Sequence, residues 1–252
     1  MVYSNLSERE SEIVRLLAAD PAISVAGLSE IIGVSAVTIR SNLNKLAKKN
    51  IIMRTHGGGV PAFHPNVVAR QMVLMAEKNR IARAAAALIN DGDNIMIEAG
   101  TTTALIPKFL LGKHDIRIVT NSTLILPSAR TNPAIQVTLV GGEFRAATES
   151  VVGPISLEQL EDFHVRLAFV GTDGFTMANG LTTHLVEGAE IVRKMAERSD
   201  STILVADSSK YGKRGFVKVL PLAAVKKVIT DKKLASEALQ ELKGVGLEVI
   251  LS

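Results

Sequence analysis

Two helical patterns joined by a tight turn, followed by a glycine-rich hairpin, constrain the first quarter of the chain. Between Leu28 and Val60 the sequence is LSEIIGVSAVTIRSNLNKLAKKNIIMRTHGGGV. Gly33 can adopt the positive φ of a turn between helices, and Ser35 is a favourable N-cap for the helix that follows. The apolar segment and the three glycines after that helix predict two short strands around a turn at residues 56–59.

Another helix is expected before this pair. Ser7 and Glu10 have the spacing of a capping box, and Pro21 is expected to end the helix near Asp20. In the third helix, three apolar residues fall on one face at i, i+4 and i+7. They are Ile39, Leu43 and Leu46. The remaining polar and basic side chains must point outward.

Positive charge is concentrated in the same region. Residues 31–76 contain no Asp or Glu but six basic residues: Arg40, Lys45, Lys48, Lys49, Arg54 and Arg70. The whole chain has a formal net charge of +4, so the remainder is slightly acidic. A major groove admits one helix, whose early residues meet base edges while cations neutralise phosphates. This region therefore predicts binding to double-stranded DNA.

We expect the DNA contacts on the outward face of the third helix and on the hairpin. The residues are Ser35, Ala36, Val37, Thr38, Arg40, Ser41, Asn44, Lys45, Lys48, Arg54 and His56. A three-helix packing module with a solvated basic face is the alternative. The acid-free segment and the wing together favour DNA. Without tryptophan and with 4% aromatic residues, a stacking platform for single strands is not expected.

Composition restricts the chemistry of the chain. The absence of cysteine excludes disulfides and thiolate sites, and the five histidines lack metal-ligand spacing. We expect neither metal nor cofactor. The amino terminus lacks a secretory pattern, and no apolar run approaches the roughly 20 residues that span a bilayer. A cytoplasmic protein with no membrane partner is expected.

The chain changes character after two prolines, Pro61 and Pro65. We expect a DNA-binding domain at 1–60, a linker at 61–76 that could move, and a larger domain at 77–252. Helix patterns at 78–90 and 103–111 alternate there with strand patterns. The predicted strands are 94–98, 116–120, 135–140, 166–170, 202–206, 225–230 and 247–251. This alternation predicts an α/β body with a parallel sheet, helices on both faces, and ligands beyond the carboxyl ends of the strands.

The strand at 94–98 leads into Glu98-Ala99-Gly100-Thr101-Thr102-Thr103 at a predicted helix start. Backbone N–H groups and hydroxyls there suit a phosphate, whereas a threonine N-cap would explain one hydroxyl without a ligand. From the residues alone both remain open. Gly112-Lys113 is followed by His114, so no nucleotide-hydrolysing P-loop is present.

Four more strand ends carry polar or glycine residues. They are Thr120-Asn121-Ser122, Gly141-Gly142-Glu143-Phe144-Arg145, Gly171-Thr172-Asp173-Gly174 and Asp207-Ser208-Ser209-Lys210. Each alone is an ordinary turn. Because carboxyl ends of parallel strands share one edge, their combination favours a site there.

Residues 7–60 resemble the winged helix-turn-helix of the DeoR family of bacterial transcriptional repressors, whose hallmark is VSxxTIRRDLxxL, then a glycine, an apolar strand and RxHGGA. The matching residues are Val34-Ser35, Thr38-Ile39-Arg40, Leu43, Leu46, Arg54 and His56-Gly57-Gly58. The chain departs from the family at Ser41, Asn42 and Asn50, where Arg, Asp and Gly are usual. The missing arginine removes one phosphate or base contact that the family pattern implies.

Residues 77–231 resemble the effector domain of the same family. The shared motifs are EKxxIA at Glu77 to Ala82, the GTTT loop, the TN and GG pairs, VGP at Val152 to Pro154, GxDG, GLTT at Gly180 to Thr183, DSSK and ITD at Ile229 to Asp231. That domain is similar in fold to ribose-5-phosphate isomerase and glucosamine-6-phosphate deaminase, which implies a sugar-phosphate pocket.

The resemblance implies roles for particular residues. Gly100, Thr101, Thr102 and Thr103 would hold the phosphate, and Asn121, Asp173 and Lys210 would face the sugar. Glu98, Gly141, Gly142 and Gly174 complete the expected effector site. Glu98 replaces a usual aspartate, and Val192 stands where lysine is common.

The resemblance implies a repressor of a carbohydrate-utilisation operon, bound to its operator as a homodimer or homotetramer and released by a phosphorylated sugar. An isomerase-like enzyme with a DNA-binding module is the alternative. Related isomerases resemble GADxxD at the third loop, whereas this chain keeps Asp173 and has Thr176 at the later acid. We therefore assign no catalytic residue. A constitutive DNA-binding architectural protein is a third possibility.

Overall fold

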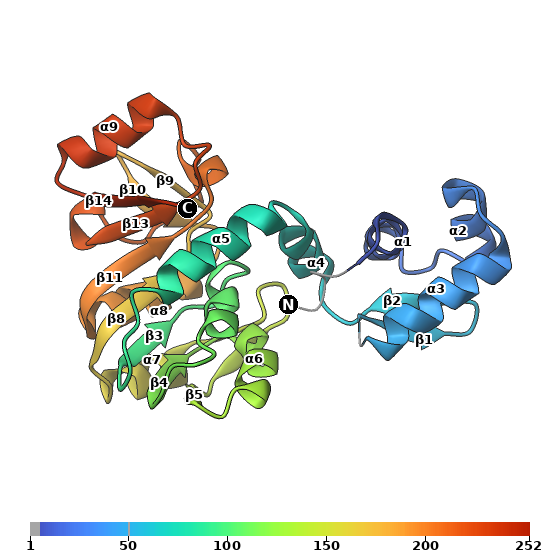
Figure 1. Ribbon diagram of the computed structural model, residues 1–252, viewed down its shortest axis with the longest axis horizontal. Coiled ribbons are helices and arrows are strands. Elements are labelled where there is room, and N and C mark those ends of the chain that lie inside the picture. The colour runs from blue at the N-terminus through green and yellow to red at the C-terminus, as the bar shows by residue number, and fades with distance from the viewer. Residues whose placement is uncertain (1–5, 50) are drawn as a thin grey trace. The chain divides into compact units, whose positions relative to one another are not determined.

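A computed structural model describes residues 6–49 and 51–252, which form two compact units (Figure 1). The first unit extends to Met75 and includes the segment Ala146–Thr148. The second comprises Ala76–Arg145 and Glu149–Ser252. Within the described ranges, no helix is long and apolar enough to cross a membrane.

The first unit has four helices and a two-stranded hairpin among its described residues. Its elements are α1 (Glu8–Ala19), α2 (Val25–Ile32), α3 (Ala36–Lys48), β1 (Ile52–Thr55), β2 (Gly58–Pro61) and α4 (Pro65–Met72). The capping box at Ser7 and Glu10 is present, and Gly33 ends α2 with a φ of 73°. The predicted apolar stripe of α3 is confirmed, because Ile39, Leu43 and Leu46 are fully buried.

The wing is tighter than predicted. Thr55 pairs with Gly58, so the turn contains only His56 and Gly57, and Gly58 and Gly59 belong to β2. A Cβ at Gly58 would lie 2.9 Å from the carbonyl oxygen of Ile23. Glycine is therefore needed because the hairpin backbone approaches the chain before α2.

The segment predicted as a linker, residues 61–76, contains a helix. Pro65 occupies the first turn of α4, where its missing N–H has no partner to lose. Val68 is buried in the core of the first unit, and Pro61 pairs with Ile52 in the hairpin. The two prolines therefore mark a strand end and a helix start. Our expectation that residues 61–65 form the moving connection does not match this arrangement.

The second unit is built on seven parallel strands in the order β14-β13-β11-β8-β3-β4-β5. These strands are β3 (Asn94–Ile97), β4 (Ile116–Thr120), β5 (Ile135–Leu139), β8 (Val165–Val170), β11 (Ser199–Val205), β13 (Lys227–Thr230) and β14 (Glu248–Leu251). The connecting helices are α5 (Met75–Ala86), η1 (Thr103–Phe109), α6 (Leu126–Thr131), α7 (Pro154–Glu161), α8 (Val186–Glu197) and α9 (Ser236–Gly244).

The predicted parallel α/β body is confirmed. Met96 and Ala168 are register partners on neighbouring strands and pack against Ile191 of α8. Because side chains alternate along a strand, Ile97 and Phe169 face the opposite side, and both are fully buried. The sheet is therefore covered on both faces, and Figure 1 shows α5 running across it.

Some predicted elements differ in detail. The helix expected at 103–111 is the 3₁₀ helix η1, which contains Pro107 and therefore lacks one backbone donor. Two small antiparallel sheets were not predicted. They consist of β6 (Glu143–Arg145) with β7 (Ser150–Val152), and of β9 (Gly174–Thr176), β10 (Gly180–Thr183) and β12 (Val217–Lys218). Their strands are too short for a clear alternating pattern.

Substitutions at Gly33 test the turn between α2 and α3. Gly33→Ala is expected to destabilise the first unit by about 1–2 kcal/mol, because an L-residue is strained at positive φ. Gly33→Asn is expected to cost less, since asparagine tolerates this conformation. Nothing lies within 4 Å of the Cβ position, so packing does not contribute. Native-state hydrogen exchange of the buried α3 amides measures the change; equal protection in the alanine variant and the wild type would contradict it.

Candidate functional site

The residues predicted to bind DNA occupy one outward face of the first unit. Nine of them are exposed: Ser35, Val37, Arg40, Ser41, Asn44, Lys45, Lys48, Arg54 and His56. Ala36 and Thr38 are partly buried. Arg54 on β1 donates a hydrogen bond to the side-chain oxygen of Asn44 on α3, at 3.1 Å. The wing strand and the third helix are thus joined by two side chains of the predicted face.

The hydroxyl groups at the start of α3 stabilise the helix itself. The Ser35 side chain accepts from the Thr38 backbone N–H at 3.2 Å and lies 2.9 Å from the Thr38 hydroxyl. Val37 follows in the first turn with its side chain 73% exposed. An exposed β-branched apolar residue at this position can contact a thymine methyl group.

The cations of this face differ in their partners. Lys49 donates to Glu10 of α1 at 3.0 Å. Burial raises the pKa of Glu10, but the Ser7 N–H and Lys49 outweigh it, so the pKa lies below its usual value. By contrast, no carboxylate of the described chain pairs with Arg40, Lys45 or Lys48. Lys49 therefore ties α3 to α1, and the other three leave positive charge on the surface.

The candidate effector site lies where the strand order reverses. After β3 the chain adds β4 and β5 on one side, and it later returns to add β8 on the other side of β3. The carboxyl ends of β3 and β8 therefore flank a switch point, where open α/β sheets bind ligands. A carboxylate oxygen of Glu98 accepts from the Gly171 N–H at 3.0 Å, which joins the two loops there.

The three threonines of the loop after β3 have different environments. The Thr103 hydroxyl donates to the Glu98 carbonyl oxygen at 2.7 Å, and the side chain is buried. Thr103 thus closes the loop. The alternative of a threonine N-cap is not observed, because Thr102, at the N-cap of η1, makes no side-chain capping hydrogen bond. Thr101 is partly exposed, and its hydroxyl accepts from the ammonium group of Lys78 at 3.4 Å.

Lys78 is a site residue that we did not single out from the sequence. It lies in the first turn of α5 and is 5% exposed. A buried cation beside Thr101 gives the loop the positive charge that an anion requires. The signal was present in the EKxxIA motif, but helical spacing alone does not distinguish this lysine from a solvated one.

Asn121, which the resemblance places facing the sugar, is bonded to backbone at both ends of its side-chain amide. Its side-chain oxygen accepts from the Ala99 N–H at 2.9 Å, and its amide group donates to the Val151 carbonyl at 3.2 Å. The residue is 1% exposed. Both ends of the amide therefore hold backbone, so Asn121 positions the loop after β3.

Gly141 and Gly142 likewise serve close packing. The Gly141 carbonyl accepts from the Ser156 hydroxyl at 2.5 Å. A Cβ at Gly142, whose φ is 136°, would lie 2.4 Å from the same hydroxyl oxygen. Gly142 lets the chain after β5 lie against α7, and the Gly141 carbonyl is bonded to the same helix. These contacts give the two residues a structural role.

Asp173 and Gly174 follow β8. One Asp173 oxygen accepts from the Thr183 hydroxyl at 2.8 Å and from the His184 N–H at 3.0 Å. A Cβ at Gly174 would lie 2.4 Å from the Lys213 carbonyl oxygen. Asp173 therefore anchors the end of β10, and Gly174 permits a close approach of the loop that follows Lys210.

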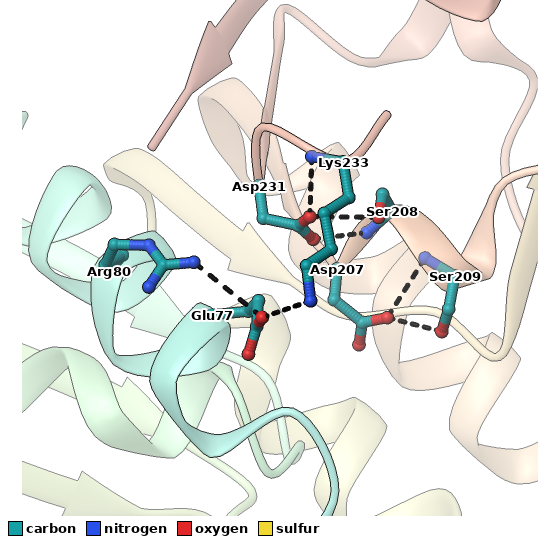
Figure 2. Close-up of polar contacts among 7 residues, drawn as sticks. All are labelled: Glu77, Arg80, Asp207, Ser208, Ser209, Asp231 and Lys233. Atoms are coloured by element: carbon teal, nitrogen blue, oxygen red, sulfur yellow. Dashed lines mark hydrogen bonds and ion pairs between the residues drawn. The ribbon is translucent and has the colours of Figure 1, made fainter. Parts of the chain in front are cut away.

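Lys210 ends the short helix η3 (Ser208–Lys210), beyond β11. It is partly exposed, and its ammonium group has no hydrogen bond or ion pair within the described residues. The start of η3 is fixed by Asp231, which accepts from the Ser208 N–H at 2.7 Å and hydroxyl at 3.0 Å (Figure 2). Burial raises the pKa of Asp231, but these hydrogen bonds outweigh it and the pKa is lowered. Lys210 is thus an available cation on an anchored loop.

Two family models match the chain. The DeoR-like helix-turn-helix domain matches residues 9–61, and the DeoR C terminal sensor domain matches residues 74–232. The chain is 30% identical over 251 residues to the putative aga operon transcriptional repressor of Escherichia coli O157:H7, covering 97% of this chain and 93% of that protein. It is 30% identical over 228 residues to the glycerol-3-phosphate regulon repressor of Escherichia coli K12, covering 89% and 90%.

Solved structures also show similarity. A D-ribose-5-phosphate isomerase in complex with phospho-erythronic acid has a TM-score of 0.40 and 20% identity, covering 56% of this chain and 55% of that chain. The translation initiation factor eIF-2B of Pyrococcus horikoshii OT3 has a TM-score of 0.42 and 16% identity, covering 88% and 95%.

Replacing Asn121 distinguishes a positioning residue from a ligand contact. Asn121→Leu leaves the Ala99 N–H and the Val151 carbonyl without partners, at a cost of about 1–3 kcal/mol each. We expect this loss in the free energy of unfolding of the second unit, measured by circular dichroism in denaturant. Gln136→Leu, at an exposed position of β5, is the control. An Asn121→Leu variant as stable as that control would refute the positioning role.

Proposed function

Because the chain belongs to the DeoR family of transcriptional regulators, we propose that it represses a carbohydrate-utilisation operon and is released from its operator by a phosphorylated sugar or sugar derivative. The observation that carries the proposal is the presence in one chain of an unpaired basic helix face and a lysine-bearing loop at a sheet switch point. Operator binding requires the chain to act in the cytoplasm, beside the chromosome.

The DNA-binding part of the proposal rests on α3 and the wing. Arg40, Lys45 and Lys48 supply charges for phosphates, and Val37 presents an apolar group for a base edge. Arg54 and His56 extend the contact surface onto the wing. Ser41, where the family usually has arginine, leaves one contact fewer, so selectivity depends more on the remaining side chains.

We propose that two or four copies bind together. A two-fold pair of recognition helices matches two half-sites about one helical turn apart. The relatives named above are repressors of an aga operon and of a glycerol-3-phosphate regulon. A symmetric operator beside genes for the use of a phosphorylated carbon source is therefore the expected target.

The effector part rests on Lys78, Thr101 and Lys210. Lysines bind phosphate through charge-assisted hydrogen bonds, and Gly100 lets the loop backbone come close to a ligand. We propose that the phosphate lies against the loop of Gly100 to Thr103 and that Asp173 and Lys210 face the sugar. The remaining expected site residues support the loops that form the site. They are Glu98, Asn121, Gly141, Gly142 and Gly174.

Binding without turnover fits the site better than isomerisation. A general base must reach an acidic carbon with an available carboxylate. One oxygen of Asp173 already accepts two hydrogen bonds from the end of β10, and the later acid of related isomerases is Thr176 here. We therefore propose that the chain senses its ligand and does not convert it.

Removing one unpaired cation of α3 tests the DNA interface. Lys45→Ala is expected to weaken binding to all duplex sequences and to reduce the slope of log K against log salt by about 0.9, the value for one phosphate contact. Titrations at several salt concentrations measure the slope. Arg15→Ala, on α1 and already paired with Glu12, should leave it unchanged. A wild-type slope near zero would refute phosphate contacts altogether.

Removing the cation of the η3 loop tests the effector site. Lys210→Met is expected to weaken binding of a phosphorylated effector by about tenfold or more, since a charge-assisted bond contributes about 1.5–3 kcal/mol. Thermal melting with ribose 5-phosphate, glucosamine 6-phosphate and glycerol 3-phosphate measures binding, with the unphosphorylated compounds as controls.

Lys226→Met is the matched control. Lys226 comes just before β13 and therefore lies at the amino ends of the strands, away from the proposed site, so this variant should keep the ligand-dependent shift in melting temperature. Shifts of equal size with phosphorylated and unphosphorylated compounds would refute a phosphate site. Formation of a ketose from ribose 5-phosphate by the wild-type protein would refute the role as a sensor without turnover.

A further inference from the structure

The first turn of α5 contacts two different loops at the carboxyl edge of the sheet. Lys78 donates to Thr101 in the loop after β3. Glu77, its neighbour, is 9% exposed and accepts from the ammonium group of Lys233 in the loop after β13, at 2.7 Å (Figure 2). Adjacent residues of one helical turn thus bond to loops on opposite sides of the switch point.

Further hydrogen bonds connect Lys233 to the loop that carries Lys210. The Lys233 backbone N–H donates to Asp231 at 3.0 Å, and Asp231 accepts twice from Ser208 at the start of η3. Figure 2 shows this series of contacts from α5 to η3. It contains side chains of three chain segments, and its last member lies two residues from Lys210.

The position of α5 in the chain makes this connection relevant to the DNA-binding unit. Val73 and Leu74 separate α4 from α5, and the second residue of α5, Ala76, is the first residue of the second unit. Leu74 has a φ of 53°, a conformation that leucine rarely adopts and that stores strain. Every covalent path from the effector loops to α3 passes through this turn and α5.

We infer that the ion pair between Glu77 and Lys233 couples effector occupancy to the first turn of α5, and through it to the DNA-binding unit. The inference rests on the proposed function, since it assigns the transmitting contact of the same site. Glu77 and Lys233 are positioning residues and need not touch the effector.

The physical basis is that Glu77 and Lys78, adjacent in the first turn of α5, bond to different loops, and a bound anion changes the forces on one of these bonds. Lys78 follows Glu77 on α5, and Lys210 lies on η3, whose start is bonded to Asp231, two residues before Lys233. An anion in the Gly100–Thr103 loop attracts both lysines. A change in either loop therefore displaces or releases the first turn of α5. A ligand shifts such an equilibrium only by its differential affinity for the two arrangements, and the ion pair gives the two loops a shared element to act on.

The solvent exposure of Lys233 limits how strongly Lys233→Met can change the release of DNA. The Lys233 side chain is 67% exposed, and an exposed ion pair makes only a small contribution to stability, so the expected change is a small multiple, about two- to fivefold. Lys233→Met should therefore fold normally. It should raise the effector concentration that releases half of the DNA by about two- to fivefold, while direct effector binding stays within error of the wild type.

The experiment compares release with direct binding in the full chain. DNA is a duplex that the wild-type protein selects from a random library, and the probes are ribose 5-phosphate, glucosamine 6-phosphate and glycerol 3-phosphate. Lys232→Met is the matched control, because Lys232 is the exposed neighbour and has no ion pair in the described structure. Lys233→Arg should retain normal release, since it preserves the charge.

The outcomes separate the two proposals. A wild-type protein that neither binds nor responds to any probe overturns the proposed function and this inference with it. If the wild type responds, equal release by Lys233→Met and Lys232→Met overturns the coupling alone. The coupling is also overturned if Lys233→Met weakens direct effector binding by the same factor as it raises the effector concentration needed to release DNA. A loss of release without loss of binding, rescued by Lys233→Arg, supports the inference.

Discussion

The reversal of strand order between β3 and β8 is the constraint on which the effector site depends. Parallel strands place all their carboxyl ends at one edge, and the reversal opens a crevice between two loops at that edge. Glu98 spans this point by accepting from the Gly171 N–H. The identity of Glu98, where the family usually has aspartate, matters because the longer side chain sets the separation at which that bond forms.

Hydrogen-bond partners separate structural from functional residues within each motif. Lys49 is bonded to Glu10, whereas Lys45 of the same basic segment has no such partner. Thr103 and Asn121 donate or accept within the loop backbone, whereas Thr101 faces a buried lysine. A motif is therefore a mixture of residues that bind and residues that hold the binding residues in place, and only the contacts distinguish them.

The sequence predicted the elements whose patterns are long and regular. The stripe of α3 and the parallel strands were foreseen because period 3.6 and buried apolar runs persist over several residues. The sequence could not assign the partners of Asn121 or Lys78, because Val151 and Thr101 come near them only in the folded sheet. The roles of Pro61 and Pro65 were not predicted, since a proline in the first turn of α4 and a proline at a break look the same in sequence.

The helical character of residues 65–72 changes where motion between the units can arise. A break at Pro61 to Pro65 would have placed the connection before α4. With Val68 buried in the first unit, that unit extends through α4 and the turn at Val73 and Leu74 to Met75, the first residue of α5. Any force on the first turn of α5 is then applied within a few residues of the DNA-binding unit.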